Sequence, residues 1–156
     1  MTLKEGQQAP EFTLPDQDGS PVALTAFAGR KVLLYFYPKD DTPGCTTEAC
    51  QLNDSLSNFE GLGVDVVGVS ADDGESHRAF RQRYGLGFSL LSDTDHQVME
   101  AYGAWGERTL RDGTVGVGVI RSSFLVGEEG QIERAWYGVT PDGHAAEVLV
   151  ALHASD

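Results

Sequence analysis

The feature that constrains the fold most is a nearly unbroken apolar run at residues 32–37, Val-Leu-Leu-Tyr-Phe-Tyr. Such a run, rich in residues that favour strands, is typical of a central strand buried on both faces. A polar, turn-rich loop follows at residues 38–44, and apolar residues then recur at helical spacing from Pro43 to about Phe59. This order of strand, loop and helix predicts an α/β domain with a ligand site at the carboxyl end of a strand.

The remaining segments extend this alternation of strands and helices. We expect a short helical turn at residues 25–29, whereas residues 103–118 are rich in glycine and predict an extended surface loop. The other expected elements are an N-terminal hairpin of residues 12–14 and 22–24, strands at 64–69, 88–91, 122–126 and 132–139, and helices at 75–84, 97–102 and 142–153. Because the sequence has no repeat, linker or low-complexity tract, it predicts one α/β domain over residues 1–156, with helices flanking a central sheet.

The chain is strongly acidic, with a formal net charge of -13 over 156 residues. An acidic surface repels phosphate backbones and anionic lipids, so we expect neither nucleic acid nor a membrane as a partner. The sequence has no run of about 18 apolar residues that would span a bilayer. Its first residues, Met-Thr-Leu-Lys-Glu-Gly, lack the apolar stretch of a signal peptide, so we expect a cytoplasmic location.

The chain contains two cysteines, Cys45 and Cys50, five residues apart. In a reducing compartment, such a pair is more typical of catalysis or metal binding than of a structural disulfide. The C-x4-C spacing lacks the C-x2-C pairs of a zinc site, so we expect no metal. From the spacing alone, two ordinary buried cysteines remain an equal alternative.

Cys45 falls where a helix is expected to begin. Thr42 is suited to the N-cap and Pro43 to the first helical position, which places Cys45 in the first turn. The free N–H groups and the helix dipole at that end favour a thiolate over a thiol. Gly44 carries no side chain that would block the approach of a small reactant.

Glu48 works against this thiolate. It follows Cys45 by three residues, on the same helix surface, and its carboxylate disfavours a second negative charge nearby. The site therefore needs a cation, and Arg121 is the best candidate because it opens a strand after the glycine-rich loop. We expect Glu48 to hold Arg121 in a bidentate ion pair.

The spacing of the two cysteines also has a geometric consequence. In an ideal helix, Cα atoms five residues apart are separated by about 8.6 Å. A disulfide needs about 4.4–6.8 Å between Cα atoms. Cys45 and Cys50 therefore cannot bond while the helix is intact, and a disulfide between them would require the segment from Thr42 to about Asn53 to unwind. Gly44 and the threonines at 46 and 47 make a weak helix start.

The segment from Tyr35 to Cys50 closely resembles the active-site segment of the peroxiredoxins. The P-x-x-x-T-x-x-C motif stands here as Pro38, Thr42 and Cys45, and the second cysteine five residues on is similar to the bacterioferritin comigratory protein, or peroxiredoxin Q, branch. Further matches run along nearly the whole chain: Val69-Ser70-Ala71-Asp72 with His77, Leu90-Leu91-Ser92-Asp93, Ala101-Tyr102-Gly103 with Trp105-Gly106-Glu107, Arg121-Ser122 with Phe124-Leu125, and Gly143-His144-Ala145.

The resemblance implies a thioredoxin-like fold with a central mixed sheet, and a thiol peroxidase that acts on hydrogen peroxide and organic hydroperoxides. It implies that Cys45 is oxidised to a sulfenic acid and that Cys50 attacks it to give an intramolecular disulfide. Thioredoxin or a similar dithiol protein would reduce that disulfide. Pro38 would shield the thiolate, Thr42 would orient the peroxide and Arg121 would stabilise charge. The family needs no metal or organic cofactor, and an intramolecular pair favours a monomer.

Two further expectations concern the loop before Cys45. The Thr42 hydroxyl has one hydrogen to donate and two lone pairs, so we expect it to accept the Cys45 N–H as a cap while donating to a bound peroxide. Lys39, Asp40 and Asp41 are charged and are expected to form a solvated loop.

The sequence departs from the family pattern at several positions. Ser123 stands where threonine is common, Val126-Gly127 replaces a common Ile-Asp, and the stretch from Arg111 to Val119 is rich in glycine and valine. These differences predict a pocket loop that differs from the usual one. His77, His96, His144 and His153 are interpreted as surface or structural residues rather than catalytic ones.

Two other functions use the same cysteines. One is a thiol–disulfide oxidoreductase without peroxide chemistry, although the absence of a C-x-x-C motif argues against it. The other is a non-enzymatic redox sensor or holdase that uses unwinding of residues 42–53 as its signal. Catalytic turnover of peroxide distinguishes both from a peroxidase.

Overall fold

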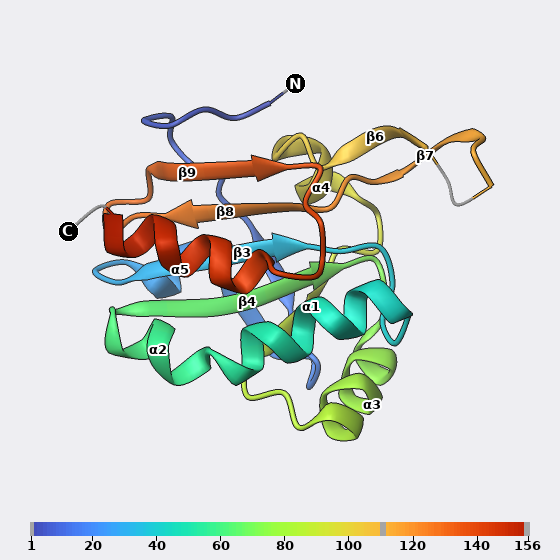
Figure 1. The fold of residues 1–156 in the computed structure, drawn as a ribbon, viewed down its shortest axis with the longest axis horizontal. Helices are drawn as coiled ribbons and strands as arrows, with labels where there is room; N and C mark the ends of the chain where they lie inside the picture. Colours follow the sequence, from blue (N-terminus) through green and yellow to red (C-terminus); the bar gives the residue numbers. More distant parts are fainter. Residues whose placement is uncertain (1, 110–111, 155–156) are drawn as a thin grey trace.

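A five-stranded mixed sheet forms the centre of the protein in a computed structural model that describes residues 2–109 and 112–154 (Figure 1). The strand order is β5-β4-β3-β8-β9. Strands β3 (Lys31–Phe36), β4 (Val64–Ser70) and β5 (Ser89–Ser92) run parallel, and β8 (Ser122–Val126) and β9 (Ile132–Tyr137) are antiparallel to their neighbours. The predicted α/β fold with a central mixed sheet is therefore confirmed.

Strand β3 occupies the middle of the sheet because its side chains are apolar on both faces. Val32, Leu34 and Phe36 belong to one buried cluster, whereas Leu33 and Tyr35 belong to the other. All five are at most 1% exposed. The alternation follows from the two-residue repeat of a strand, which sends successive side chains to opposite faces. The prediction of a strand buried on both faces is confirmed.

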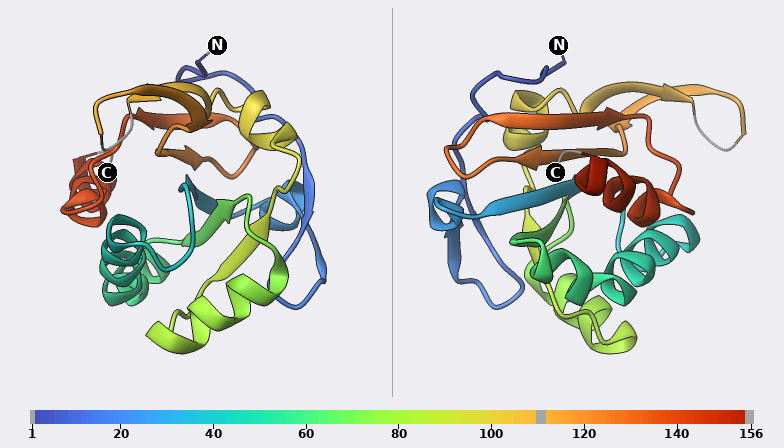
Figure 2. Two further views of the ribbon diagram at one scale, coloured as in Figure 1. Left: turned by 90° about the vertical axis from the view of Figure 1, so that its right-hand side faces the viewer. Right: turned by 60° about the vertical axis from the view of Figure 1, so that its left-hand side comes forward.

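Helices and the N-terminal segment cover opposite faces of this sheet (Figure 2). One face is packed against α1 (Pro43–Asp54), α2 (Leu56–Gly61), α3 (Gly74–Tyr84) and α5 (His144–Ala154). The other face is covered by α4 (Gln97–Ala101), the short 3-10 turn η1 (Leu24–Phe27) and the hairpin of β1 (Thr13–Pro15) and β2 (Pro21–Ala23). The expected N-terminal hairpin is thus present.

The helix expected from Pro43 to about Phe59 is interrupted. It ends at Asp54, and Ser55, with φ -100° and ψ 6°, leaves the helical region before α2 begins at Leu56. The apolar spacing continues through the break, since Leu52 and Phe59 are both fully buried in the same cluster. The apolar pattern alone therefore gave no sign of the break at Ser55.

The glycine-rich segment at residues 103–118 is not a loop, so that expectation was wrong. Strands β6 (Trp105–Thr109) and β7 (Val115–Val119) pair with each other as an antiparallel hairpin that projects from the body (Figure 1). Val115 and Val117 are 66% and 67% exposed, so this hairpin exists without burying an apolar face there. The two strands satisfy each other's backbone hydrogen bonds, and the alternation Val-Gly-Val-Gly-Val was the available signal. Arg111, at the start of the stretch that departs from the family pattern, lies outside the described residues.

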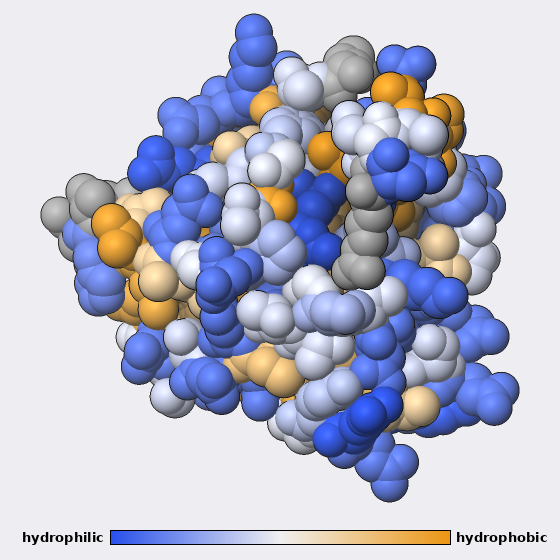
Figure 3. Space-filling view, turned by 45° about the vertical axis from the view of Figure 1, so that its right-hand side comes forward, coloured by the Kyte–Doolittle hydropathy of each residue, from blue (hydrophilic) through white to orange (hydrophobic). Residues whose placement is uncertain are grey.

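The surface is largely hydrophilic on the face toward which the amino end of α1 points (Figure 3). A strongly hydrophilic spot lies in a recess near the centre of that face, between small apolar patches. Among the helices of residues 2–109 and 112–154, none has the length and hydropathy needed to cross a bilayer.

Candidate active site

The topology of the sheet brings three chain segments to the carboxyl end of β3. The loop that leads to Cys45 leaves β3 there, and the antiparallel pairing of Phe36 with Ser122 puts the start of β8 at the same edge. The end of β4 lies alongside, because Phe36 also pairs with Val69. This arrangement places Arg121, which precedes β8, next to the beginning of α1.

Cys45 lies in the first turn of α1, as predicted. Thr42 has extended backbone angles, φ -91° and ψ 157°, Pro43 opens the helix, and the Thr46 N–H donates to the Thr42 carbonyl over 2.8 Å. The Cys45 side chain is only 1% exposed and packs in the cluster on the helical face of the sheet. Its thiol therefore meets the amino end of the helix in a setting with little solvent.

Arg121 reaches both the thiol and the neighbouring carboxylate. Its Nη2 donates to Cys45 Sγ over 3.3 Å, and its Nη1 donates to Glu48 Oε1 over 2.7 Å. The expected bidentate pair with Glu48 is wrong, because each terminal nitrogen serves a different partner. Burial alone would lower the pKa of Arg121, but the charges of Cys45 and Glu48 outweigh it and raise the pKa. Arg121 is thus a fixed cation that lies against the sulfur atom.

Gly44 has a more specific role than leaving an approach open. A Cβ atom at this position would lie 3.3 Å from Arg121 Nη2 and 3.3 Å from Pro141 Cγ. Both distances are tighter than most real Cβ contacts, so a side chain would push the guanidinium or the turn before α5 away. Glycine at residue 44 lets Arg121 come this close to the helix start.

Glu48 is a buried carboxyl group whose protonation changes near neutral pH. Burial raises its pKa to about 7, although the charge of Arg121 and its hydrogen bond oppose the shift. Within the described part of the chain, its Oε2 atom has no hydrogen-bond partner, and neither does the buried Tyr35 hydroxyl. The charge that lies beside Arg121 and Cys45 therefore depends on pH around 7.

The Thr42 hydroxyl donates to the Lys39 carbonyl over 2.9 Å and does not cap α1, so the expected cap is wrong. This bond ties the hydroxyl to the loop before the helix rather than to the N–H groups of α1. With its hydrogen already used, the oxygen presents only lone pairs, so it can accept a hydrogen bond but cannot donate one. Pro38, partly buried, lies one residue before Lys39 in this loop.

Cys50 lies on α1 with Cys45, and both thiols are free. The Cys50 side chain is partly buried, and burial together with the charge of Asp54 raises its pKa. Because α1 is continuous over Pro43–Asp54, ideal helix geometry keeps the two Cα atoms about 8.6 Å apart. In this conformation Cys50 is a protonated thiol that is out of reach of Cys45.

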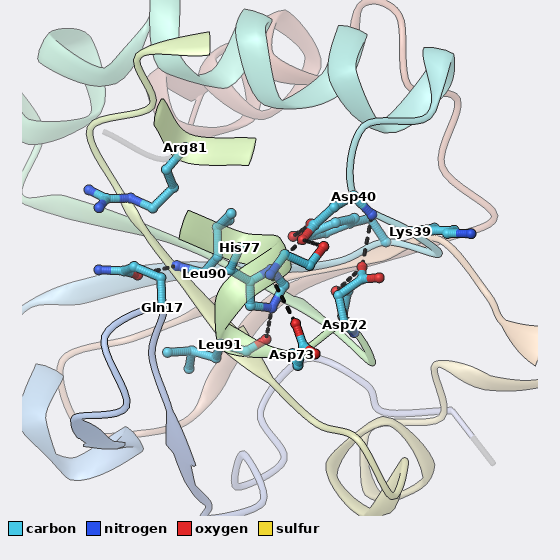
Figure 4. Close-up of polar contacts among 12 residues, drawn as sticks. Gln17, Lys39, Asp40, Asp72, Asp73, His77, Arg81, Leu90 and Leu91 are labelled. Atoms are coloured by element: carbon cyan, nitrogen blue, oxygen red, sulfur yellow. Dashed lines mark hydrogen bonds and ion pairs between the residues drawn. The ribbon is translucent and has the colours of Figure 1, made fainter. Parts of the chain in front are cut away.

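The loop at Lys39, Asp40 and Asp41 is not uniformly solvated, which corrects that expectation. Lys39 and Asp41 are exposed, but Asp40 is only 7% exposed. Its carboxylate lies among hydrogen-bond donors from Tyr37, the residue after β3, and from α3, among them His77 (Figure 4). The charges of these three residues suggested that the loop is exposed to solvent. His77, the partner of Asp40 on α3, is too distant in the sequence to be inferred. The only available signal was His77 itself, an ionisable residue in the apolar pattern of a helix.

His144 is buried and structural, as interpreted from the sequence. Its Nδ1 lies 2.8 Å from Glu147 Oε1 and its Nε2 lies 2.7 Å from Ser123 Oγ. A carboxylate only accepts, so Nδ1 carries the hydrogen and Nε2 accepts from the Ser123 hydroxyl. Burial lowers the pKa of His144, which fits this neutral ring. The Ser-His-Glu chain has the order of a hydrolytic triad, but Ser123 is 0% exposed and no substrate reaches it.

Comparison with known proteins identifies the family. The family model described as AhpC/TSA matches residues 5–135. A putative peroxiredoxin bcp of Coxiella burnetii is 48% identical over 149 residues, which are 96% of this chain and 98% of that protein. A cysteine-to-serine mutant of the peroxiredoxin Q of Xylella fastidiosa has a TM-score of 0.92 at 34% identity, with 99% and 98% of the two chains covered. The bacterioferritin comigratory protein of Xanthomonas campestris, solved to study its alkyl peroxide reduction activity, has a TM-score of 0.86 at 40% identity, with 92% and 91% covered.

Proposed function

From the premise that this chain belongs to the AhpC/TSA family, in the Bcp or peroxiredoxin Q branch of thiol peroxidases, we propose a catalytic cycle that uses both of its cysteines. The Cys45 thiolate attacks one oxygen of a hydroperoxide, the O–O bond breaks, and the alkoxide or hydroxide that leaves takes up a proton to become an alcohol or water. Cys45 becomes a sulfenic acid, oxidised by two electrons. The Cys50 thiolate then attacks the Cys45 sulfur, the S–O bond breaks, and the hydroxide that leaves takes up a proton to become water.

The observation that carries this proposal is the contact of Arg121 Nη2 with Cys45 Sγ at 3.3 Å. A guanidinium held against a sulfur atom at a helix amino end favours the thiolate. The same cation also lies where negative charge develops on the leaving oxygen. Glu48 holds the other terminal nitrogen of Arg121 at 2.7 Å, so the guanidinium stays in this orientation.

Thr42 orients the peroxide in this cycle. Because its hydroxyl hydrogen is given to Lys39, its oxygen accepts the O–H of the incoming hydroperoxide. Gly44 allows Arg121 to approach, and the partly buried Pro38 limits solvent at the thiolate. These assignments replace the sequence-based expectation that Thr42 would donate to the peroxide.

Resolution of the sulfenic acid requires the helix to change. Cys45 and Cys50 lie on one continuous helix, and a disulfide between them needs their Cα atoms about 2–4 Å closer than helix geometry allows. We therefore assign unwinding of the first turns of α1 to each catalytic cycle. The raised pKa of Cys50 fits this order of events, because the second thiol ionises readily only after it leaves its partly buried position.

The substrates and partners follow from the same reasoning. We propose hydrogen peroxide and organic hydroperoxides as substrates, in line with the alkyl peroxide reduction named for the Xanthomonas relative. Thioredoxin or a similar dithiol protein supplies two electrons to the Cys45–Cys50 disulfide. The site residues need no metal or organic cofactor for these steps. We propose a cytoplasmic monomer. The net charge of -13 supports the proposal that it binds neither nucleic acid nor membranes.

A peroxide-consumption assay tests the cycle. Wild type, Cys45→Ser and Cys50→Ser are compared with thioredoxin, thioredoxin reductase and NADPH at low enzyme concentration. Wild type should turn over many equivalents of peroxide, and Cys45→Ser should be inactive. Cys50→Ser should oxidise once at the normal rate and then fail to turn over with thioredoxin. Full activity in Cys45→Ser would exclude the proposal, and a single stoichiometric oxidation in wild type would favour a redox sensor.

A further inference from the structure

Asp40 is a buried carboxylate surrounded by hydrogen-bond donors (Figure 4). Its Oδ1 accepts from the Tyr37 hydroxyl at 2.5 Å, and its Oδ2 accepts from Ser76 Oγ at 2.9 Å. His77 Nδ1 lies 2.6 Å from the same Oδ2. Three side chains are thus directed at this one carboxyl group.

His77 lies in the first turns of α3 and is 0% exposed. Both of its ring nitrogens face acceptors, since Nε2 is 3.1 Å from the Leu91 carbonyl and Nδ1 faces Asp40. A carbonyl only accepts, so Nε2 carries a hydrogen. A neutral ring would then require Asp40 to be protonated, although Tyr37 and Ser76 already donate to it. The arrangement is best satisfied by an imidazolium and a carboxylate.

Asp72 is the other charged group that faces this pair. Its Oδ2 accepts the Asp40 backbone N–H at 2.8 Å and the Ser70 hydroxyl at 2.7 Å. One ligand atom each from Asp40, Asp72 and His77 lie within 4.8 Å of one another, which is close enough for a metal ion. Each of these atoms already has a hydrogen-bond partner within the protein, so the cluster is explained by its own network.

This network holds the loop backbone next to the Thr42 turn in place. Asp40 is fixed through both its side chain and its backbone, and it lies between Lys39 and the Thr42 turn. The Lys39 carbonyl accepts the Thr42 hydroxyl, so the position of this carbonyl sets the direction of the Thr42 lone pairs. The partners of Asp40 come from the residue after β3, from α3 and from the loop after β4, which are parts of the fold outside α1.

We propose that Asp40 and His77 form a buried ion pair that positions the Thr42 turn for reaction with peroxide. Neither residue touches the sulfur or the substrate, so both are positioning residues. The inference rests on the proposed cycle, because it needs a peroxide step at Cys45 that Thr42 orients. It predicts that loss of the pair slows that step and leaves the reactivity of the thiol toward a reagent that does not use Thr42.

The first test reads the protonation of the ring directly. In reduced, 15N-histidine-labelled wild type, nitrogen NMR at pH 7 should show hydrogens on both ring nitrogens of His77. The chain has only four histidines, so the His77→Gln variant identifies the signal. A neutral His77 ring with one hydrogen would overturn the ion pair.

The second test separates peroxide from an alkylating reagent. In single-turnover experiments, Asp40→Asn should lower the second-order rate constant of Cys45 with hydrogen peroxide at least tenfold, while alkylation of Cys45 by iodoacetamide changes less than threefold. Ser76→Ala, a milder change that removes one donor, should lower the peroxide rate constant about threefold. Asp65→Asn, which breaks the surface pair with Arg30, is the matched control and should leave both rates unchanged.

The outcomes for the two proposals differ. Wild-type peroxide rates in folded Asp40→Asn, or equal losses with peroxide and iodoacetamide, would overturn the positioning role. If Asp40→Asn does not fold, the Ser76→Ala rates and the NMR signal decide in the same way. Failure of the proposed function would instead appear in wild type, as a Cys45 thiol that reacts with iodoacetamide but not with peroxide.

Discussion

The segments before and after Cys45 are held in contrasting ways. Before it, residues 37–40 are fixed by buried bonds, and the Asp40 and His77 side chains are 3% and 0% exposed. After it, Glu48 on α1 keeps its buried pair with Arg121, but the polar bonds at Gln51 are exposed. Gln51 Nε2 donates to Asp142 Oδ1 at 2.7 Å, and Gln51 Oε1 accepts from the Gly143 N–H at 2.8 Å. Polar bonds are stronger when buried than when solvated. The comparison indicates that the bonds of Asp40 resist opening more strongly than those of Gln51, which the proposed unwinding of α1 would break.

Asp41 marks the boundary between the two segments. Its φ of 59° is in the left-handed region, which aspartate tolerates better than most residues. Its side chain accepts from Arg83 and Tyr84 at the far end of α3, but Arg83 is 66% exposed. Two neighbouring aspartates thus join the loop to opposite ends of one helix, through a buried link and an exposed one.

The largest expected effect comes from removing Arg121, the cation that contacts Cys45. Arg121→Met keeps a long apolar stem but loses both the contact with Cys45 and the pair with Glu48. Loss of one preorganised donor at a reacting centre typically lowers the rate by about 100- to 1000-fold, and we expect a decrease of this size in the rate constant of Cys45 with peroxide. Stopped-flow oxidation measures it. Arg30→Met, at an exposed arginine, is the control, and an equal decrease there would refute a local role for Arg121.

The next effect concerns pH and Glu48. Because burial raises its pKa to about 7, the folded protein binds a proton at Glu48 that the unfolded chain has already released between about pH 4.5 and 7. Stability from this group is therefore present at low pH and is lost as pH rises toward 7, by about 3 kcal/mol. Urea unfolding of reduced wild type and Glu48→Gln at pH 5 and pH 8 should show this difference between them. A wild-type minus variant difference that is constant over this range would contradict it.

The next prediction concerns the exposed bonds that Gln51 makes from α1 to the turn before α5. Gln51→Ala removes two bonds to the turn before α5, which should lower the free energy of unfolding by about 1 kcal/mol. Since unwinding of α1 breaks the same bonds, formation of the disulfide from the sulfenic acid should become about fivefold faster, while oxidation by peroxide is unchanged. Quenched-flow thiol counting separates the two steps. Gln82→Ala, on the exposed surface of α3, is the matched control, and a slower disulfide step in Gln51→Ala would show that Gln51 assists the unwinding.

The smallest effect is expected from the exposed link of Asp41. Arg83→Ala removes a solvent-exposed ion pair, and such pairs contribute about 0–1 kcal/mol. We expect less than about 0.5 kcal/mol in unfolding and less than a twofold change in the peroxide rate constant. Side-by-side stopped-flow and urea measurements with Asp40→Asn check this. A tenfold loss in Arg83→Ala would show that the exposed link, and not Asp40, fixes the loop.

Local rules were sufficient for the first turn of α1 and for β3. The position of Cys45 followed from Thr42 and Pro43, and the burial of residues 32–37 followed from their composition. The proximity of Arg121 to Cys45 was inferred from charge balance together with the family resemblance, and the antiparallel register of β3 and β8 is the physical reason for it.

What failed to follow from the sequence depends on contacts between distant segments. Asp40 is polar and adjacent to other charges, so its burial becomes favourable only when His77 arrives from α3. From the sequence, the Thr42 hydroxyl could either accept the Cys45 N–H as a helix cap or donate to a nearby backbone carbonyl. In the folded loop it donates to the Lys39 carbonyl. The hairpin of β6 and β7 was missed because the segment was interpreted as a loop from its glycine content, although its valines alternate with the two-residue period of a strand.

The most direct test is residue-resolved amide hydrogen exchange in the reduced protein and in the protein oxidised to the Cys45–Cys50 disulfide. Oxidation should remove protection at the Thr46 N–H, which donates to Thr42 in the intact helix, and at the following amides of α1. The Asp40 N–H, which donates to Asp72, should remain protected in both states. Equal protection of α1 in the two states would contradict unwinding, and equal loss at Asp40 and Thr46 would contradict a fixed loop.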